Sequence, residues 1–303
     1  MRSNFRSSAE KLGVDAYKCQ LLPISWRLEM NLPFEKENEN DNATFDTVLK
    51  SLIVTNIPAL RTIASDMLMD ILIYMTPSCG KLMVESMVKE MNRVYDLFLQ
   101  YHPNFNGKVS VIAHSLGSVL TFDALSPSTP VKPHFQIENF FSIGSPIGLF
   151  LLLNNGKFVD REQSLSLLSC NQYFNLFHPQ DPIATRIEPL IDHSMADSKP
   201  VHIPYSKGGL TKFTIAMASN LNRLSTSMGH FMRHHADKDD PLNPWISLLN
   251  KNGRLDYQLH EGVLENSYIS SIKAHVCYWN EPDISSFLLQ VITNSYAVGK
   301  GEK

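Results

Sequence analysis

The chain has 303 residues, of which 43% are hydrophobic and 19% charged, a composition that predicts a packed globular protein and excludes a largely disordered or collagen-like one. Its 27 basic and 30 acidic residues give a formal net charge of −3 without a dense lysine and arginine block, so we expect no nucleic-acid partner. The four cysteines are widely spaced and form no C-x-x-C pair, which predicts neither a zinc site nor a disulfide framework and favours a reducing, intracellular setting.

No segment has the pattern of a membrane span or of a secretory signal. The stretch 140–153 is interrupted by Gly144, Pro146 and Gly148, and the longer stretch 52–75 contains three charged residues. We interpret FSIGSPIGLFLLL as a core strand that leads into a buried helix, with insertion into a bilayer as the alternative.

In chain order, the polar and acidic segment 35–46 predicts a surface loop. Apolar residues at three- and four-residue spacing from Val84 predict a helix that ends before Pro103. The β-branched run 109–113 predicts a buried parallel strand, and 115–125 has a helical pattern. The segments 137–144 and 173–177 repeat this alternation of strand and helix, which indicates βαβ units.

The C-terminal third begins with an apparent insertion at 206–250, within which 211–235 predicts a long helix. Strands are expected at 254–259 and 268–274, followed by a final helix from Pro282. The whole pattern predicts one α/β-hydrolase-like domain over 1–303, with a mainly parallel sheet and flanking helices.

The most informative motif is Ala113-His114-Ser115-Leu116-Gly117, which matches G-x-S-x-G except that alanine replaces the first glycine. It lies between a predicted strand and a predicted helix, the context of a nucleophile elbow. There the serine hydroxyl stands clear of the sheet, and the backbone N–H of Leu116 is the expected oxyanion donor. We expect the residues two before and two after the serine to be small because the chain folds back tightly. The alternative is an ordinary small-residue turn into a helix.

A serine nucleophile needs a base and an orienting acid, which in this fold follow in the order Ser, Asp or Glu, His. Asp181 follows a predicted strand, and His275 lies at the end of the last predicted strand, so we expect these two residues to complete a triad with Ser115. The alternatives are that Asp181 is only a turn residue before proline and that His275 is a packed core residue.

With these stretches assembled, the chain resembles the DDHD-domain phospholipases, the intracellular family of phosphatidic-acid-preferring phospholipase A1. The resemblance covers nearly the whole chain and rests on LLPISWR, HPNFNGKVSVIAHSLGSVLTFDAL, FSIGSPIGLFL, FNLFHPQDPIATRIEPLI, GRLDYQL and AHVCYWNEPD. It implies hydrolysis of an acyl ester of a glycerophospholipid, or of a related lipid ester, at a membrane surface, by a cytoplasmic protein that is peripheral on intracellular membranes.

The four residues that name the domain would be Asp181, Asp256, His275 and Asp283. For the family these residues have been discussed as a metal cluster, but Asp181 and His275 are used more economically in a triad. Asp256 is then a structural hydrogen-bond partner, and Asp283 complements a helix N-terminus. We therefore expect no metal and no cofactor.

The chain departs from the family pattern at two places. Ala113 replaces the usual glycine of GHSLGS, a change that we expect to be tolerated. About 20 residues precede LLPISWR, and none resembles the HGxG-type turn that supplies the second oxyanion N–H in this fold. Loss of one such donor costs on the order of 3 kcal/mol of transition-state stabilisation, which predicts a weak enzyme or none.

Two other functions use the same features. DDHD domains also occur in lipid-transfer proteins of the retinal-degeneration-B type, so the chain could be a non-catalytic lipid-binding module. Acyl transfer to an acceptor other than water would use the same triad. A separate pair, His230 and His234, has a metal-binding spacing, but H-E-x-x-H is absent and a solvated helix end is favoured.

Overall fold

The computed structural model describes residues 1–13, 19–25, 70–153, 168–206, 244–260 and 273–298. The chain divides into two compact units, one of residues 1–21, 106–127 and 135–303, and one of residues 22–105 and 128–134. The predicted loop at 35–46 and the predicted helix at 211–235 lie outside the described residues. The prediction of a single domain stays a prediction.

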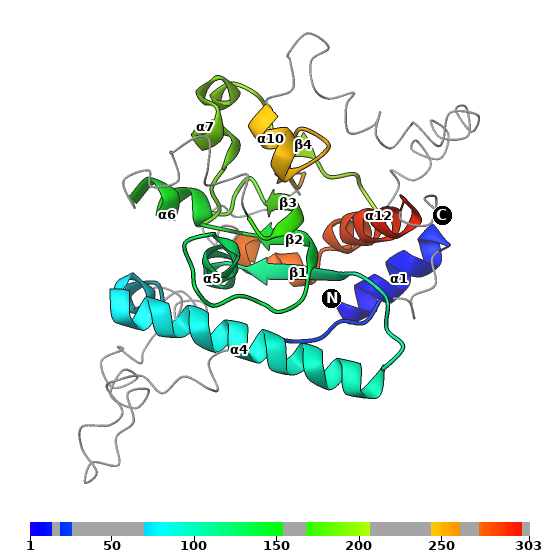
Figure 1. Cartoon of the computed structure of the whole chain (residues 1–303). Coiled ribbons are helices and arrows are strands. Elements are labelled where there is room, and N and C mark those ends of the chain that lie inside the picture. Colours follow the sequence, from blue (N-terminus) through cyan, green and yellow to red (C-terminus); the bar gives the residue numbers. More distant parts are fainter. Residues whose placement is uncertain (14–18, 26–69, 154–167, 207–243, 261–272, 299–303) are drawn as a thin grey trace, which may run out of the picture. The chain divides into compact units, whose positions relative to one another are not determined.

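The larger unit contains a five-stranded, all-parallel sheet in the order β1-β2-β3-β5-β4. The predicted α/β class is therefore confirmed (Figure 1). Its strands are β1 (Val109–His114), β2 (Ile137–Ile143), β3 (Cys170–Phe177), β4 (Val201–His202) and β5 (Asp256–Gln258). Its described helices are α1 (Arg2–Leu12), α5 (Leu116–Leu125), α6 (Ile147–Leu153), α7 (Glu188–Ile191), η4 (His193–Ala196), α10 (Pro244–Leu249), η6 (Cys277–Trp279) and α12 (Pro282–Val298).

The central strands β2 and β3 are largely buried because both faces of the sheet are covered. Phe140 of β2 stacks on Tyr173 of β3, with ring centroids 5.0 Å apart. The next pair, Phe141 and Phe174, stacks at the same distance and belongs to the opposite face because side chains alternate along a strand. The two stacked pairs therefore bind β2 to β3 on both faces of the sheet.

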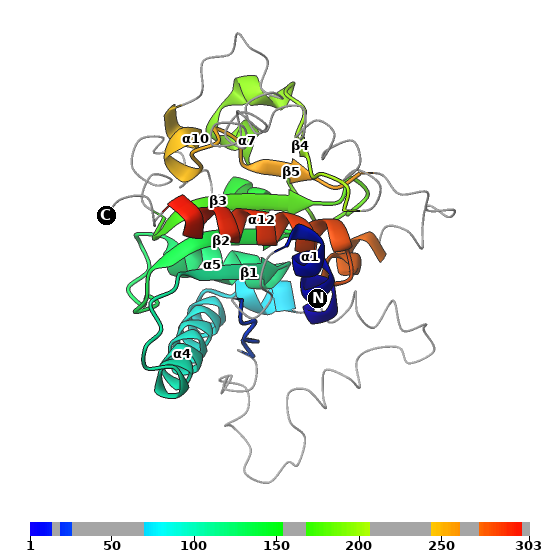
Figure 2. The same ribbon diagram turned by 90° about the vertical axis from the view of Figure 1, so that its right-hand side faces the viewer.

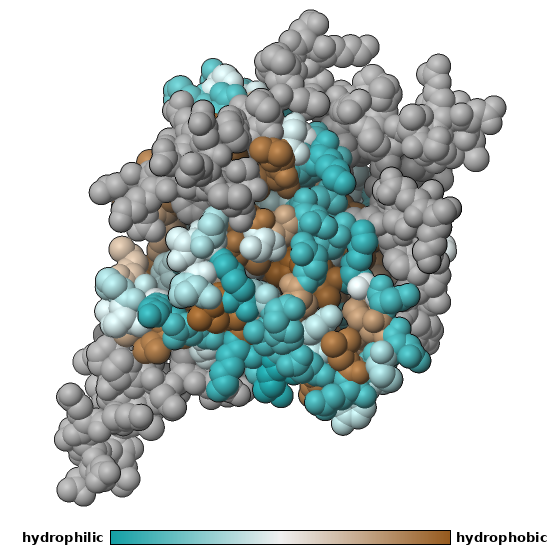
Figure 3. Space-filling model, in the orientation of Figure 1, coloured by the Kyte–Doolittle hydropathy of each residue, from teal (hydrophilic) through white to brown (hydrophobic). Residues whose placement is uncertain are grey.

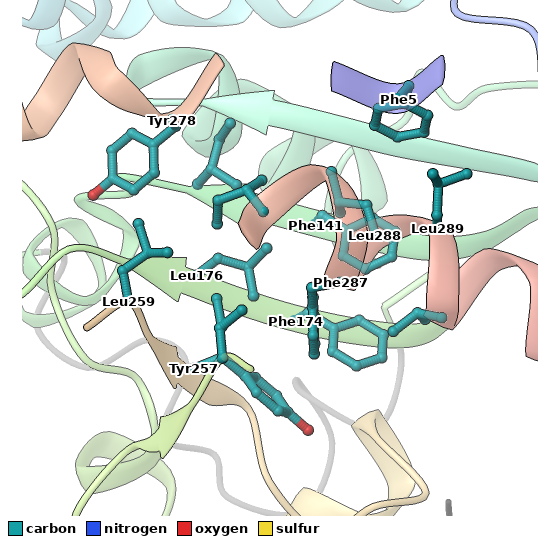
Figure 4. Close-up of a cluster of buried hydrophobic side chains, with 14 of the residues drawn as sticks. Phe5, Phe141, Phe174, Leu176, Tyr257, Leu259, Tyr278, Phe287, Leu288 and Leu289 are labelled. Carbon is teal, nitrogen blue, oxygen red and sulfur yellow. The ribbon is translucent and has the colours of Figure 1, made fainter. Parts of the chain in front are cut away.

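Helices α1 and α12 pack together over one face of the sheet (Figure 2). Their apolar side chains join those of β2, β3, β4 and β5 in a buried cluster (Figure 4). Phe5 and Ala9 enter from α1, and Phe287 from α12 lies edge-on to Phe174 with ring centroids 5.9 Å apart. Because residues 2–12 and 282–298 cover the same core, the two ends of the described chain lie together.

The smaller unit includes α4 (Pro77–Tyr101), which begins with Pro77 at its first position and ends before Pro103, as the apolar spacing predicts. Glu90 is buried in this helix, and the Arg93 guanidinium donates two hydrogen bonds to its carboxylate, at 2.6 and 2.9 Å. These bonds hold the pKa of Glu90 below its usual range, so the carboxylate stays charged despite its burial.

The surface includes an apolar side of α6, where Leu149, Leu152 and Leu153 are exposed. On the face seen in Figure 3, hydrophobic residues lie in separate groups among hydrophilic ones. No helix in the described ranges is both long and apolar enough to cross a membrane.

Removing the ring of Phe174 should destabilise the fold strongly because this ring is fully buried against Phe141, Tyr257 and Phe287. We expect Phe174→Ala to lower the free energy of unfolding by about 3–5 kcal/mol, measured by urea denaturation. Leu152→Ala is the control: Leu152 is 64% exposed, so its substitution should change the free energy by less than about 0.5 kcal/mol. A loss below about 1 kcal/mol for Phe174→Ala would contradict this account of the core.

Candidate active site

Ser115 lies at the turn between β1 and α5, where the sequence predicts a nucleophile elbow. Its backbone angles are φ 52° and ψ −128°, and it is the only non-glycine residue with positive φ in the described part of the chain. This conformation is costly for a residue with a β-carbon, and strain of this kind is concentrated at functional sites. The Ser115 N–H donates to the carbonyl of Ile143, 3.1 Å away, so the end of β2 holds the turn in place.

His275 lies on a helical turn and not on a strand. Residues 273–276 are α-helical and continue into η6, so the predicted strand 268–274 is wrong at its described end, and the rest of it lies outside the described residues. The run around Ala274 and Tyr278 is short and apolar, and periodicity alone does not separate a buried strand from a buried helical turn of that length. The structure resolves this ambiguity because the turn packs its residues into the site.

Three side chains distant in the sequence form one hydrogen-bonded chain. The Ser115 hydroxyl lies 3.0 Å from Nε2 of His275. Nδ1 of the same imidazole lies 2.9 Å from each carboxylate oxygen of Asp181. Ser115, Asp181 and His275 are buried, with 7%, 7% and 2% of their surfaces exposed. This arrangement matches the geometry of an activated serine nucleophile.

The Asp181 carboxylate is surrounded by donors. Oδ1 also accepts from the backbone N–H groups of Ile183 and Ala184, at 2.9 and 3.3 Å, and Oδ2 accepts from the Tyr278 hydroxyl at 2.6 Å. Burial by itself would raise the pKa of Asp181, but hydrogen bonds from His275, Tyr278 and Ile183, with the attraction of His275, hold that pKa below its usual range. Asp181 is therefore ionised at neutral pH.

His114, one residue before the serine, is a contact that the sequence does not predict. Its Nε2 lies 2.7 Å from the backbone carbonyl of His275, and the two imidazole rings are 4.7 Å apart. Burial, followed by repulsion from His275, lowers the pKa of His114 to about 4. His114 is therefore neutral at physiological pH, and its Nε2–H donates to the backbone carbonyl of His275.

The predicted oxyanion donor, Leu116, is the first residue of α5, where N–H groups have no partner within the helix. The prediction that the residue at position 117 must be small is wrong. A β-carbon on Gly117 would meet no heavy atom within 4 Å. The first turn of the helix has open space beside Gly117, so close packing does not exclude a larger side chain. Ala113 is buried in β1 beside Ser142 of β2, and its extra methyl group is accommodated.

Asp256 lies in β5 and its contacts are structural. Its carboxylate accepts from Nδ2 of Asn175, Nε of Arg186 and the backbone N–H groups of Ile187 and Glu188, at 2.9–3.3 Å. Burial and the neighbouring charge of Glu188 raise the pKa of Asp256 to about 6. The bonds join β5 to residues 186–188 and so fix the far end of the loop that carries Asp181.

Asp283 lies in the first turn of α12, as the sequence predicts for a residue that complements a helix N-terminus. Its Oδ1 accepts from the backbone N–H of Ser206 at 2.6 Å. Asp181, Asp256 and Asp283 thus bind different protein donors, and within the described ranges no three His, Cys, Asp or Glu side chains are grouped to hold a metal ion. The four residues that name the family do not fit one metal centre. The pair His230 and His234 lies outside the described residues.

Tyr278, like His114, makes a contact in this site that the sequence does not predict. Its spacing of three residues from His275 is the available signal, but that spacing places both side chains on one side only when the segment is helical.

The comparisons with known proteins show similarity to lipid hydrolases. The DDHD domain matches residues 134–238 and 233–293. The chain is 33% identical over 298 residues to a probable mitochondrial phospholipase of Saccharomyces cerevisiae, an alignment that covers 91% of this chain and 42% of the relative. It is 24% identical over 415 residues to the phospholipase DDHD1 of Bos taurus (89% of this chain, 46% of the relative) and 21% identical over 461 residues to the triacylglycerol hydrolase DDHD2 of Mus musculus (98% and 64%).

The chain spans 42–64% of the length of these three relatives. No solved structure matches it. The two matched ranges include Asp181, Asp256, His275 and Asp283 and together extend over more than half of the chain. The chain therefore belongs to the DDHD-domain family of phospholipases and related lipid hydrolases.

Proposed function

We propose that this chain is a serine ester hydrolase of the phospholipase A1 type, which cleaves an acyl ester of a glycerophospholipid such as phosphatidic acid. The observation that carries the proposal is the continuous hydrogen-bond chain from the Ser115 hydroxyl through His275 to Asp181. The names of the relatives, phospholipases and a triacylglycerol hydrolase, support a lipid ester as the substrate.

In the first half of the reaction, Ser115 Oγ attacks the acyl carbonyl while its proton passes to Nε2 of His275. Asp181 accepts Nδ1–H and stabilises the imidazolium that forms. The carbonyl oxygen becomes an oxyanion, which the Leu116 N–H stabilises. Collapse of this intermediate breaks the ester bond, and the lysolipid alkoxide leaves with the proton from His275. In the second half, water attacks the acyl-enzyme by the same route and releases a fatty acid.

We propose that the enzyme works at a membrane surface without spanning it. An acyl chain must leave a bilayer to reach a buried serine, and the exposed leucines of α6 are an apolar surface on the segment that follows β2. The family resemblance implies a cytoplasmic protein that is peripheral on intracellular membranes. The yeast relative is named as mitochondrial, so mitochondrial membranes are the first to examine.

Replacing the serine should abolish activity without unfolding the chain. We expect Ser115→Ala to lose labelling by a fluorophosphonate probe and to hydrolyse phosphatidic-acid vesicles at least about 10⁴-fold more slowly, because the nucleophile is gone. Ser3→Ala, at an exposed position on α1, is the matched control and should keep full labelling. Wild-type protein that binds the vesicles but does not label would instead support the non-catalytic lipid-binding alternative.

Asp181→Asn should slow hydrolysis by about 10⁴-fold, because the imidazole loses its orienting charge. The substitution also has a pH signature. The pKa of Asp181 lies below its ordinary value of 3.8, so the ionised carboxylate stabilises the fold above that pH, and this contribution disappears as the pH falls. We expect the difference in unfolding free energy between wild type and Asp181→Asn, from urea titrations, to shrink between pH 7 and pH 3. A constant difference would contradict the assignment.

Elemental analysis should find no tightly bound metal ion per chain. The reason is that the Asp256 and Asp283 carboxylates already accept backbone and side-chain N–H bonds. Chelators should leave hydrolysis unchanged. One zinc or similar ion per chain, lost in His275→Ala, would overturn this prediction.

A further inference from the structure

We propose that Tyr278 is a positioning residue of this site, whose hydroxyl holds the ionised carboxylate of Asp181 in place and thereby orients the His275 imidazole toward Ser115. This inference rests on the proposed serine mechanism. It goes beyond that mechanism because it assigns to the proton-transfer step a fourth side chain, one that acts through Asp181.

The direction of the hydrogen bond is fixed by the neighbours of the phenol. The backbone N–H of His178 lies 2.9 Å from the Tyr278 oxygen, and a backbone N–H can only donate. The phenol oxygen therefore acts as acceptor on that side, and its own proton goes to Oδ2 of Asp181, 2.6 Å away. A hydrogen bond to a charged acceptor is short and strong, as observed here.

The helical turn brings both groups onto one carboxylate. His275 and Tyr278 are three residues apart, and residues at this spacing lie on the same side of a helix. In a strand an odd separation would place them on opposite faces. Because 273–279 are helical, the imidazole and the phenol reach the same Asp181 side chain.

The phenol ring has little freedom to move away. It is fully buried at one end of the apolar cluster, with its hydroxyl pointing away from the cluster (Figure 4). Gly144, at φ 56°, lies against the ring: a β-carbon there would come within 2.6 Å of Tyr278 Cε2 and 2.9 Å of Asp181 Oδ2. The end of β2 therefore supports the phenol and the carboxylate together, and glycine is required at this position.

The hydroxyl also affects proton affinity. The titratable groups around Asp181 and His275 are His114 from β1, Ser115, His178 from the Asp181 loop, and Cys277 and Tyr278 from the helical turn. The His114 pKa is lowered to about 4, and burial raises the Cys277 pKa to about 12, so both are neutral at physiological pH. In a Tyr278→Phe variant, loss of the hydroxyl donor makes the Asp181 carboxylate more basic. The carboxylate then attracts the His275 imidazolium more strongly. The acidic limb of the pH profile of the reaction should then lie at higher pH.

The test is Tyr278→Phe in the full chain, followed through the second-order rate of fluorophosphonate labelling between pH 5 and pH 9. This probe avoids the ionisation of lipid headgroups over that range. We expect labelling at the optimum to slow by about tenfold, and the acidic limb of the profile to move to higher pH. In an Asp181→Ala background, Tyr278→Phe should have no further effect, because the hydroxyl acts through that carboxylate.

Tyr173→Phe is the matched control. Tyr173 is also fully buried, in β3, and its hydroxyl lies 3.0 Å from the Ser142 hydroxyl. This variant should lose similar stability but keep the labelling rate and its pH profile. If Tyr278→Phe behaves like Tyr173→Phe, with no shift of the acidic limb, Tyr278 is only structural and the proposal is wrong.

A second substitution keeps the test valid if Tyr278→Phe does not fold. Site-specific Tyr278→3,5-difluorotyrosine keeps the ring and makes the hydroxyl a stronger donor, so the acidic limb should move to lower pH. No movement, or movement to higher pH, would overturn the proposal. Labelling that survives in Ser115→Ala would instead refute the proposed function, so the two failures are distinguishable.

Discussion

A buried carboxylate is stable only when its oxygens are fully hydrogen-bonded, and this requirement organises the site around Asp181. The side chain is completely inaccessible, and its donors come from its own loop, from the imidazole of His275 and from the phenol of Tyr278. Each of these groups has to lie within about 3 Å of one carboxylate, which ties the loop after β3 to the helical turn 273–279. The position of the imidazole in front of Ser115 is a consequence of that convergence.

The same requirement for full hydrogen bonding applies to a second buried carboxylate, that of Glu188, at the end of the loop that carries Asp181. Glu188 is fully buried and accepts two bonds from the Arg254 guanidinium, at 2.9 and 3.0 Å, and two from the backbone N–H groups of Leu255 and Asp256. Asp256 in turn accepts the N–H groups at 187 and 188. Two carboxylates therefore bond β5 to the loop that begins at the end of β3 and ends at α7. Glu188 accepts from backbone N–H groups at 255 and 256, and Asp256 accepts from those at 187 and 188. Two aspartates of the family motif have different contacts: Asp181 is hydrogen-bonded to the His275 imidazole, and Asp256 to the loop that carries Asp181.

The parallel sheet supplies the remaining constraint. Backbone bonds continue past the ends of the strands, from Ser115 to Ile143 and from Gly144 to Leu176, at 3.1 and 2.9 Å. Each turn is held by the carbonyl of the neighbouring strand, so the strained conformation of Ser115 and the positive φ of Gly144 are imposed by the sheet. The carboxyl ends of parallel strands meet at one edge, and this is why the serine, the acid and the glycine that supports Tyr278 are neighbours.

The sequence by itself determined the alternating helices and strands from α4 to β3 and the final helix α12, because apolar runs and helical spacing are local signals. It also predicted the turn at Ser115 and the positions of Asp181 and His275 after it in the chain, since AHSLG and the strand-end position of Asp181 are readable without the fold. It did not determine that His275 lies on a helical turn, because a short apolar run is compatible with a strand. Tyr278, His114 and the separate contacts of Asp256 and Asp283 were decided only by tertiary structure. The physical reason is that a hydrogen bond depends on the distance and direction between two groups, and here its partners are 68 to 161 residues apart in the chain.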